Sequence, residues 1–229
     1  MKITKYWNTN EKEVKSRKFN IFIGISLGNL YFSKENIRKY ILWALENTKK
    51  SVLIFIADKN HSINLNLRKN YSKKEAINTT IKMGDEIENS IRSIINGLPK
   101  EKQKLVKIMR WEDLEKLKEY QHRLEPIKKE FSKNKNFKSA IMNIVTNCVK
   151  IEKDNLKIIE GLSLYVLNEL PLFIDYIEYQ NERYNLIPYP GGDDLNDLAL
   201  DIQNGKLFPE LTKKLKPEGK MAFVNAYVD

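Results

Sequence analysis

Residues 21–57 read IFIGISLGNLYFSKENIRKYILWALENTKKSVLIFIA, and their pattern indicates the class of fold. It begins with the apolar run 21–26 and ends with a second apolar run, 51–57, rich in β-branched and aromatic residues. Short runs of this kind predict buried strands. Between them Ser33 can cap a helix, and a strand, a helix and a second strand in this order predict a crossover between parallel strands. The apolar residues at helical spacing in this segment are Ile37, Tyr40, Ile41 and Ala44.

The rest of the chain continues the alternation of helices and strands. Ser72 starts a long candidate helix that runs to Asn96, whereas residues 61–71 are expected to form a loop. Together with the elements below, these patterns predict one α/β domain over residues 1–229, with a parallel sheet covered by helices on both faces and a basic leader at 1–19. Ligands of such sheets bind beyond the carboxyl ends of the strands. The further elements expected are a strand at 105–109, two helices within 112–149, a helix at 155–170, a strand at 184–187, a turn at 188–194, a helix at 194–203 and a strand at 221–228.

The charge of the chain is unevenly distributed. The 229 residues contain 40 Lys plus Arg and 30 Asp plus Glu, for a net charge of +10. Residues 1–150 carry 32 basic and 16 acidic side chains, whereas residues 151–229 carry 8 basic and 14 acidic ones. This asymmetry predicts a polyanionic partner. The alternative is that the Lys-rich composition reflects genomic base bias, with the lysines covering solvated helix faces.

Cysteine content and hydropathy exclude several classes of protein. Cys148 is alone, so no disulfide framework is expected. The first 18 residues contain no apolar signal-peptide core, and no run approaches 18 uninterrupted apolar residues. We therefore expect a cytoplasmic monomer that is not membrane-bound. One Cys and two distant His, His61 and His122, predict no metal site.

The turn after the first strand matches a nucleophile pattern. Gly24 to Gly28 read G-I-S-L-G, the G-x-S-x-G spacing in which a sharp turn exposes a serine hydroxyl. A serine hydrolase also needs a histidine and an acid. His61 and His122 lie at unusual positions for that role, so the hydrolase is a minor alternative. Ser26 and Gly28 could equally form an ordinary turn between a strand and a helix.

A second candidate pair lies in the predicted helix 155–170. Tyr165 and Glu169 are four residues apart and share one helical face in an otherwise apolar segment. A buried carboxylate needs a cationic or hydrogen-bonding partner, and a substrate ammonium would supply one. The alternative is a Tyr packed in the core and a Glu whose carboxylate reaches the surface.

These two segments together resemble the tRNA-dependent cyclodipeptide synthases. That family has a strand reading H-x-φ-φ-G-φ-S, where φ is aliphatic, and a helix reading Y-φ-x-x-E-x-P about 140 residues later. Here residues 20–26 read NIFIGIS and residues 165–171 read YVLNELP, and Tyr165 follows Ser26 by 139 positions. Asn20 replaces the family histidine. The chain also combines Asn29, typical of one subgroup, with Tyr189-Pro190, typical of the other.

The resemblance implies a Rossmann-like sheet similar to the catalytic domain of class I tyrosyl and tryptophanyl aminoacyl-tRNA synthetases. The HIGH and KMSKS nucleotide motifs of those enzymes are absent from this chain. No cofactor and no ATP are therefore expected, because aminoacyl-tRNA esters are already activated. The substrates would be two aminoacyl-tRNAs, and the product a cyclic dipeptide made through aminoacyl and dipeptidyl esters of serine.

The resemblance also implies roles for individual residues. Ser26 would be the nucleophile, Tyr165 and Glu169 would hold the α-ammonium group, Tyr189 would relay a proton, and Asn29 would orient the acyl group with the backbone of Gly28. The first side-chain pocket would be lined by Phe22, Gly24, Gly28, Ile54, Leu172 and Phe173. The residues expected to contact tRNA are Arg68, Lys69, Lys73, Lys74, Lys82, Arg92, Lys128 and Lys129.

One alternative from a different class remains open at this point. The chain could be a non-catalytic tRNA- or RNA-binding α/β module, in which Ser26 belongs to a turn and Glu169 is a surface charge. The motifs do not indicate which two amino acids are joined.

Overall fold

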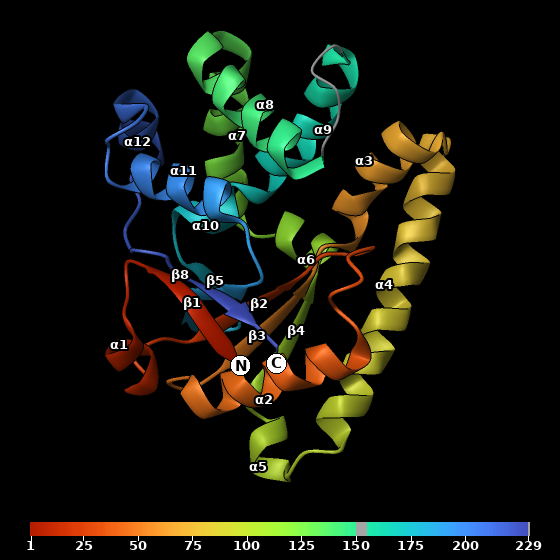
Figure 1. Ribbon diagram of the computed structural model, residues 1–229, viewed down its shortest axis with the longest axis vertical. Coiled ribbons are helices and arrows are strands. Elements are labelled where there is room, and N and C mark those ends of the chain that lie inside the picture. The colour runs from red at the N-terminus through yellow and green to blue at the C-terminus, as the bar shows by residue number, and fades with distance from the viewer. Residues whose placement is uncertain (150–154, 229) are drawn as a thin grey trace.

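The computed structural model describes residues 1–149 and 155–228 as an α/β fold built on one mixed six-stranded sheet (Figure 1). Five of the strands are parallel, and only β1, at one edge, runs antiparallel to its neighbour β8. The predicted parallel sheet is therefore confirmed for these five strands, and the antiparallel β1 makes the complete sheet mixed. In spatial order the strands are β1 (Lys2–Trp7), β8 (Ala222–Tyr227), β7 (Leu186–Tyr189), β2 (Ile21–Ile25), β3 (Val52–Ile56) and β4 (Val106–Arg110).

The basic leader 1–19 is part of this fold. Residues 2–7 form β1, and a short helix, α1 (Glu11–Lys15), follows with Asn10 as its N-cap. Lys2 pairs with Tyr227, at the opposite end of the chain, so both termini lie side by side (Figure 1). This strand escaped prediction because its partner lies more than 200 positions away and only Trp7 is fully buried.

The unit β2–α2–β3 is confirmed, with α2 spanning Lys34–Asn47. The Ser33 side chain accepts a hydrogen bond from the backbone N–H of Asn36, which caps this helix. β2 and β3 pair in parallel with Gly24 opposite Phe55. Because side chains alternate between the two faces of a sheet, this register decides which residues can reach a site on either face.

The predicted loop 61–71 is mostly helical. α3 spans Asp58–Lys69 and ends at Asn70, whose φ of 58° is left-handed. Its run of Asn, His and Ser favours helix only weakly. The helix is stabilised by tertiary packing, because Ile63 and Leu67 lie one turn apart and contact the apolar cluster of Val145, Ile159 and Leu162. The packing that decides this element is invisible in the local sequence.

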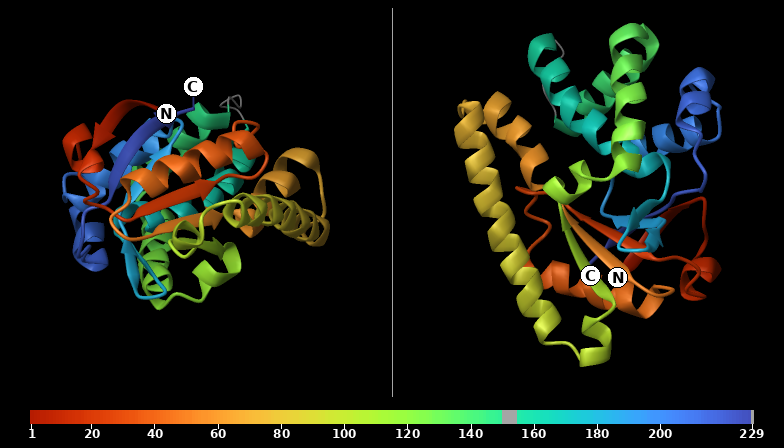
Figure 2. Two further views of the ribbon diagram at one scale, coloured as in Figure 1. Left: turned by 90° about the horizontal axis from the view of Figure 1, so that it is seen from below. Right: turned by 180° about the vertical axis from the view of Figure 1, so that it is seen from behind.

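The long helix predicted to begin at Ser72 is confirmed as α4 (Lys73–Asn96), with Ser72 and Glu75 forming a capping box. It lies beside α3 at the edge of the molecule (Figure 2). The two predicted helices within 112–149 are α7 (Lys118–Lys133) and α8 (Lys135–Val149), and the helix at 155–170 is α9 (Leu156–Glu169). The remaining elements are α5 (Lys100–Gln103), α6 (Trp111–Glu115), α10 (Pro171–Ile174), β5 (Ile177–Tyr179), β6 (Glu182–Tyr184), α11 (Asp193–Gln203) and α12 (Pro209–Leu215).

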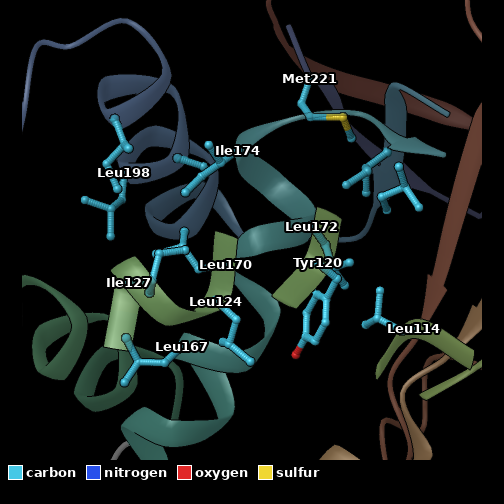
Figure 3. Close-up of a cluster of buried hydrophobic side chains, with 14 of the residues drawn as sticks. Leu114, Tyr120, Leu124, Ile127, Leu167, Leu170, Leu172, Ile174, Leu198 and Met221 are labelled. Atoms are coloured by element: carbon cyan, nitrogen blue, oxygen red, sulfur yellow. The ribbon is translucent and has the colours of Figure 1, made fainter. Parts of the chain in front are cut away.

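Two apolar cores cover the two faces of the sheet. One lies between the sheet and α2 and α4, and includes Ile23 and Ile54. The other lies beneath α6 to α12 and includes Phe22, Leu53 and Phe55. Figure 3 shows part of this second core, into which Leu124 of α7, Leu167 of α9 and Leu198 of α11 point. Among the described residues, no helix has the length and apolarity needed to cross a bilayer.

Candidate active site

The candidate site lies where β2 and β7 separate. Leu186 pairs with Ile21, and this is the single register position that joins the two strands. The backbone N–H of Leu186 bonds to the carbonyl of Asn20. Two residues further along, the backbone nitrogen of Pro188 also points toward β2, but proline has no N–H with which to continue the hydrogen-bond ladder. The two carboxyl ends therefore diverge, at the point where the order of the parallel strands reverses.

A chain of hydrogen bonds spans this crevice. The Tyr189 hydroxyl donates to Ser26 Oγ over 3.1 Å, and Asn29 Nδ2 donates to the Tyr189 oxygen over 3.5 Å. On the other side, Tyr165 lies within interaction range of Ser26 and Glu169, and both of them influence the pKa of its phenol. Asn29, Tyr189 and Ser26 are thus hydrogen-bonded in series, and Tyr165 and Glu169 extend this polar cluster, which comes from the turn after β2, from β7 and from α9.

Burial controls the protonation states of Tyr165, Tyr189 and Glu169. It raises the pKa of Tyr165 well above its usual value, and it also raises the pKa of Tyr189. Both phenols are therefore protonated at neutral pH and can donate hydrogen bonds. Burial raises the pKa of Glu169 to about 7, although the hydrogen bond from Tyr165 opposes the shift. A cation bound beside Glu169 would favour its ionised form.

A cavity of about 800 Å³ opens beside Ser26. Several residues expected to line a pocket do line it: Phe22, Gly24, Gly28, Leu172 and Phe173. Phe55 and Ile187 line it as well, although the sequence analysis did not single them out. The strand register could have identified Phe55, because this residue lies opposite Gly24.

The prediction that Ile54 lines the pocket is wrong. It lies next to Phe55 along β3, so its side chain points to the opposite face of the sheet. There it is fully buried in the core beneath α2 and α4 and does not line the cavity.

Asn20 lies at the other end of β2 and has a structural function. Its Oδ1 accepts hydrogen bonds from the backbone N–H groups of Lys50 and Ser51. Its Nδ2 donates to the carbonyl of Arg183 and to the Glu182 carboxylate. These hydrogen bonds join the start of β2 to the residues before β3 and to β6, at the end of β2 opposite Ser26.

The basic residues expected to contact tRNA separate into three groups. Arg68, Lys69, Lys73, Lys74 and Lys82 are exposed along α3 and α4. Arg92, lower on α4, forms an ion pair with Glu88. Lys128 and Lys129 are exposed on α7, away from that pair of helices. Only the first group extends to the cavity, which Arg68 lines.

Two acidic residues on α4 are bound by an arginine of β4. Asp85 and Glu88 both accept hydrogen bonds from the guanidinium group of Arg110, at the end of β4. Arg110 also bonds the buried carboxylate of Asp58. The side chains of Asp85 and Glu88 thus turn toward the end of β4, whereas Glu75 caps the start of α4 beside the lysines. Within residues 1–149 and 155–228, no cluster of His, Cys, Asp and Glu suits a metal ion.

Comparisons with known proteins identify the family and the fold. A family model described as cyclodipeptide synthase matches residues 7–190. A cyclodipeptide synthase from Staphylococcus haemolyticus is 23% identical, with 95% of this chain and 94% of that chain covered and a TM-score of 0.70. For one from Bacillus thermoamylovorans the identity is 19%, the coverage 95% and 93%, and the TM-score 0.72. One from Candidatus Glomeribacter gigasporarum, solved with Phe-tRNAPhe, is 18% identical, with 92% and 88% covered and a TM-score of 0.61. Comparison with curated protein sequences gave no match.

Proposed function

This chain belongs to the cyclodipeptide synthase family and is an enzyme, and we propose that it joins the aminoacyl groups of two aminoacyl-tRNAs through covalent intermediates on Ser26. The observation that carries the proposal is the polar cluster of Tyr189, Ser26, Tyr165 and Glu169, in which the Tyr189 hydroxyl donates to Ser26 Oγ and Tyr165 interacts with both Ser26 and Glu169. It combines a hydroxyl nucleophile with an anion for a substrate ammonium, in one cavity.

The first step transfers an aminoacyl group to the enzyme. Ser26 Oγ attacks the ester carbonyl of the first aminoacyl-tRNA, and the bond between that carbonyl and the terminal ribose oxygen breaks. The proton lost by Ser26 is balanced by the one gained by the released ribose hydroxyl. The product of this step is an aminoacyl ester of Ser26.

The α-amino group of this ester would lie beside Tyr165 and Glu169. The ionised Glu169 carboxylate stabilises the ammonium form, and the charge-assisted hydrogen bond also fixes the orientation of the amine. Apolar side chains from β2, β3 and β7 surround the space on the sheet side of Ser26: Phe22, Phe55 and Ile187. These contacts support an apolar first amino acid.

Two aminolysis steps complete the product. The ammonium group gives one proton to solvent, and the resulting amine attacks the ester carbonyl of a second aminoacyl-tRNA. The bond from that carbonyl to the terminal ribose oxygen breaks, this oxygen takes a second proton from the amine, and a dipeptidyl ester of Ser26 remains as the second tRNA leaves. The new terminal amine then attacks the carbonyl held by Ser26, closes the six-membered ring and returns a proton to Ser26 Oγ. The Tyr189 hydroxyl lies 3.1 Å from that oxygen, which supports a role for Tyr189 in relaying this proton. Proximity within one cavity favours ring closure.

Incubation with an aminoacyl-tRNA whose amino acid is isotopically labelled tests the proposal. Wild-type protein should gain the mass of one aminoacyl group, whereas Ser26→Ala should gain none and release no cyclic dipeptide. Tyr189→Phe should accumulate covalent intermediates, because the last proton transfer becomes slow. The control is Ser33→Ala, which alters a nearby serine that caps α2. Undiminished labelling of Ser26→Ala would overturn the assignment of the nucleophile.

A further inference from the structure

One wall of the cavity is a polar stripe on α3. His61, Asn64 and Arg68 all line the cavity. Their spacing of three and then four residues places them on one helical face. His61 and Asn64 are half-buried, and Arg68 is exposed. The stripe therefore leads from the interior of the cavity toward solvent, over about 10 Å of helix.

The inner end of the stripe lies against the turn that carries Ser26. Gly28 has a φ of +72°, and a Cβ built on it would lie 3.1 Å from Nε2 of His61. Asn64 Nδ2 is 3.5 Å from His61 Nδ1. With the Asn64 amide nitrogen as the donor, Nδ1 would accept and Nε2 would carry the ring proton. Burial, with a smaller effect of Arg68, lowers the pKa of His61, so the ring is neutral.

The charges of the cavity walls differ. Opposite α3, the start of α11 contributes the carboxylates of Asp193 and Asp194. Among the described residues that line the cavity, Arg68 is the only Lys or Arg, and it forms no ion pair with any described residue. Lys69, Lys73 and Lys74 continue the positive charge outward from Arg68. A polyanion would therefore enter along α3 and avoid α11.

We propose that His61, Asn64 and Arg68 bind the 3′-terminal nucleotide of the aminoacyl-tRNA, an inference that rests on the function proposed above. The terminal ribose is esterified to the aminoacyl group, so it must lie next to Ser26 when the carbonyl is attacked. His61 Nε2–H and the Asn64 amide present donors and an acceptor for ribose hydroxyls at that place. Arg68 presents a guanidinium group for the adjoining phosphate.

The test compares two acyl donors on the same protein. One is an aminoacyl-tRNA, and the other is a cyanomethyl ester of the same amino acid, which has no nucleotide. For His61→Ala, Asn64→Ala and Arg68→Ala, the rate of Ser26 acylation should fall about tenfold more with the tRNA donor than with the small ester. His61→Gln should recover part of the loss, because its amide nitrogen can replace the Nε2–H donor. Arg38→Ala, an exposed arginine on α2, is the control.

Direct binding gives a second measurement that does not depend on chemistry. Wild-type protein should bind an RNA tetranucleotide with the tRNA 3′ sequence more tightly than its DNA counterpart, and His61→Ala and Asn64→Ala should lose this preference. Equal losses with both acyl donors would mean that the stripe only positions the Ser26 turn, and unchanged rates would also overturn the proposal. If neither donor acylates wild-type protein, the nucleophile is wrong, and the tetranucleotide preference alone decides whether α3 binds the RNA end.

Discussion

At the scale of single residues, the burial of Glu169 in the wall of the cavity changes the pH at which this side chain ionises. Burial raises its pKa from the ordinary 4.5 to about 7. The native state therefore holds this proton more tightly than the unfolded chain does. The stabilising effect is fully present below the unfolded pKa of 4.5 and is lost as the pH rises through 7.

The direction of this pKa shift predicts the effect of Glu169→Gln on stability. Gln resembles the protonated acid, so near pH 5 the variant and wild-type protein should unfold at similar temperatures. At about pH 8.5 the variant should be more stable, by up to about 3 kcal/mol, because it avoids a desolvated carboxylate. Thermal unfolding at a series of pH values measures the difference, which should grow mainly between pH 5 and 8. A difference independent of pH would contradict the raised pKa.

Gly24 illustrates how one absent methyl group shapes the cavity. A Cβ built there would meet only Phe22 Cε1, at 3.9 Å, which is an ordinary contact. Gly24→Ala should therefore fold normally, and its methyl group should occupy space beside Ser26. We expect the mixture of cyclic dipeptides to shift toward smaller first amino acids, as measured by product masses from competing aminoacyl-tRNAs. Gly97→Ala, at the far end of α4, is the matched control and should leave the mixture unchanged.

At the scale of elements, α4 is joined to α3 and β4 at Gly84. A Cβ there would lie 2.4 Å from Arg110 Nη2 and 2.8 Å from Asp58 Cβ. Both residues belong to the largely buried ion pair that joins the end of β4 to the start of α3. Only glycine permits this close approach, even though glycine weakens a helix.

Gly84→Ala should consequently destabilise the protein, although replacing Gly by Ala inside a helix usually has a stabilising effect. Helix propensity alone would favour Ala by about 1 kcal/mol, whereas breaking the Arg110–Asp58 pair costs about 3–5 kcal/mol. Denaturant unfolding should show a net loss of a few kcal/mol. Asn89→Ala, an exposed change on the same helix, should be neutral or slightly stabilising. An equally small effect at Gly84 would mean that the ion pair moves aside at little cost.

At the scale of the whole molecule, we expect tRNA to bind to one particular surface, formed by the exposed basic residues of α3 and α4. Lys73 and Lys74 are exposed at the start of α4 and form no ion pair with a described residue. Lys49 and Lys50 are likewise adjacent, exposed and free of such pairs, but they lie before β3, at the end of the sheet opposite Ser26. The two pairs have equal charge and differ in place.

Charge reversal of each pair to Glu distinguishes tRNA binding at the surface of α3 and α4 from general attraction of tRNA by the net charge. Lys73→Glu with Lys74→Glu should weaken binding of uncharged tRNA and lower the magnitude of its log–log salt slope by about 2, because about two phosphate contacts are lost. The two glutamates would lie in the first turn of α4, where negative charge favours the helix, so the fold should persist. Reversal of Lys49 and Lys50 should change binding little. Equal effects of both pairs, measured by filter binding, would favour recruitment by net charge alone.

Local patterns in the sequence determined the elements that contain strong local signals. The apolar runs of β2 and β3, the Ser33 and Ser72 caps, and the Tyr165–Glu169 pair on α9 are properties of a few neighbouring residues, and each was predictable. The spacing of Ser26 and Tyr165 was enough to indicate the family.

Tertiary structure alone decided which distant residues meet. β1 forms because residues at the other end of the chain complete its ladder, and α3 is helical because Ile63 and Leu67 find an apolar surface on α8 and α9. Strand register placed Phe55 in the cavity and Ile54 on the opposite face. Divergence of β7 from β2 at Pro188 brought Tyr189 and Asn29 together beside Ser26. Contacts between segments far apart in the chain depend on packing and register, which no local periodicity encodes.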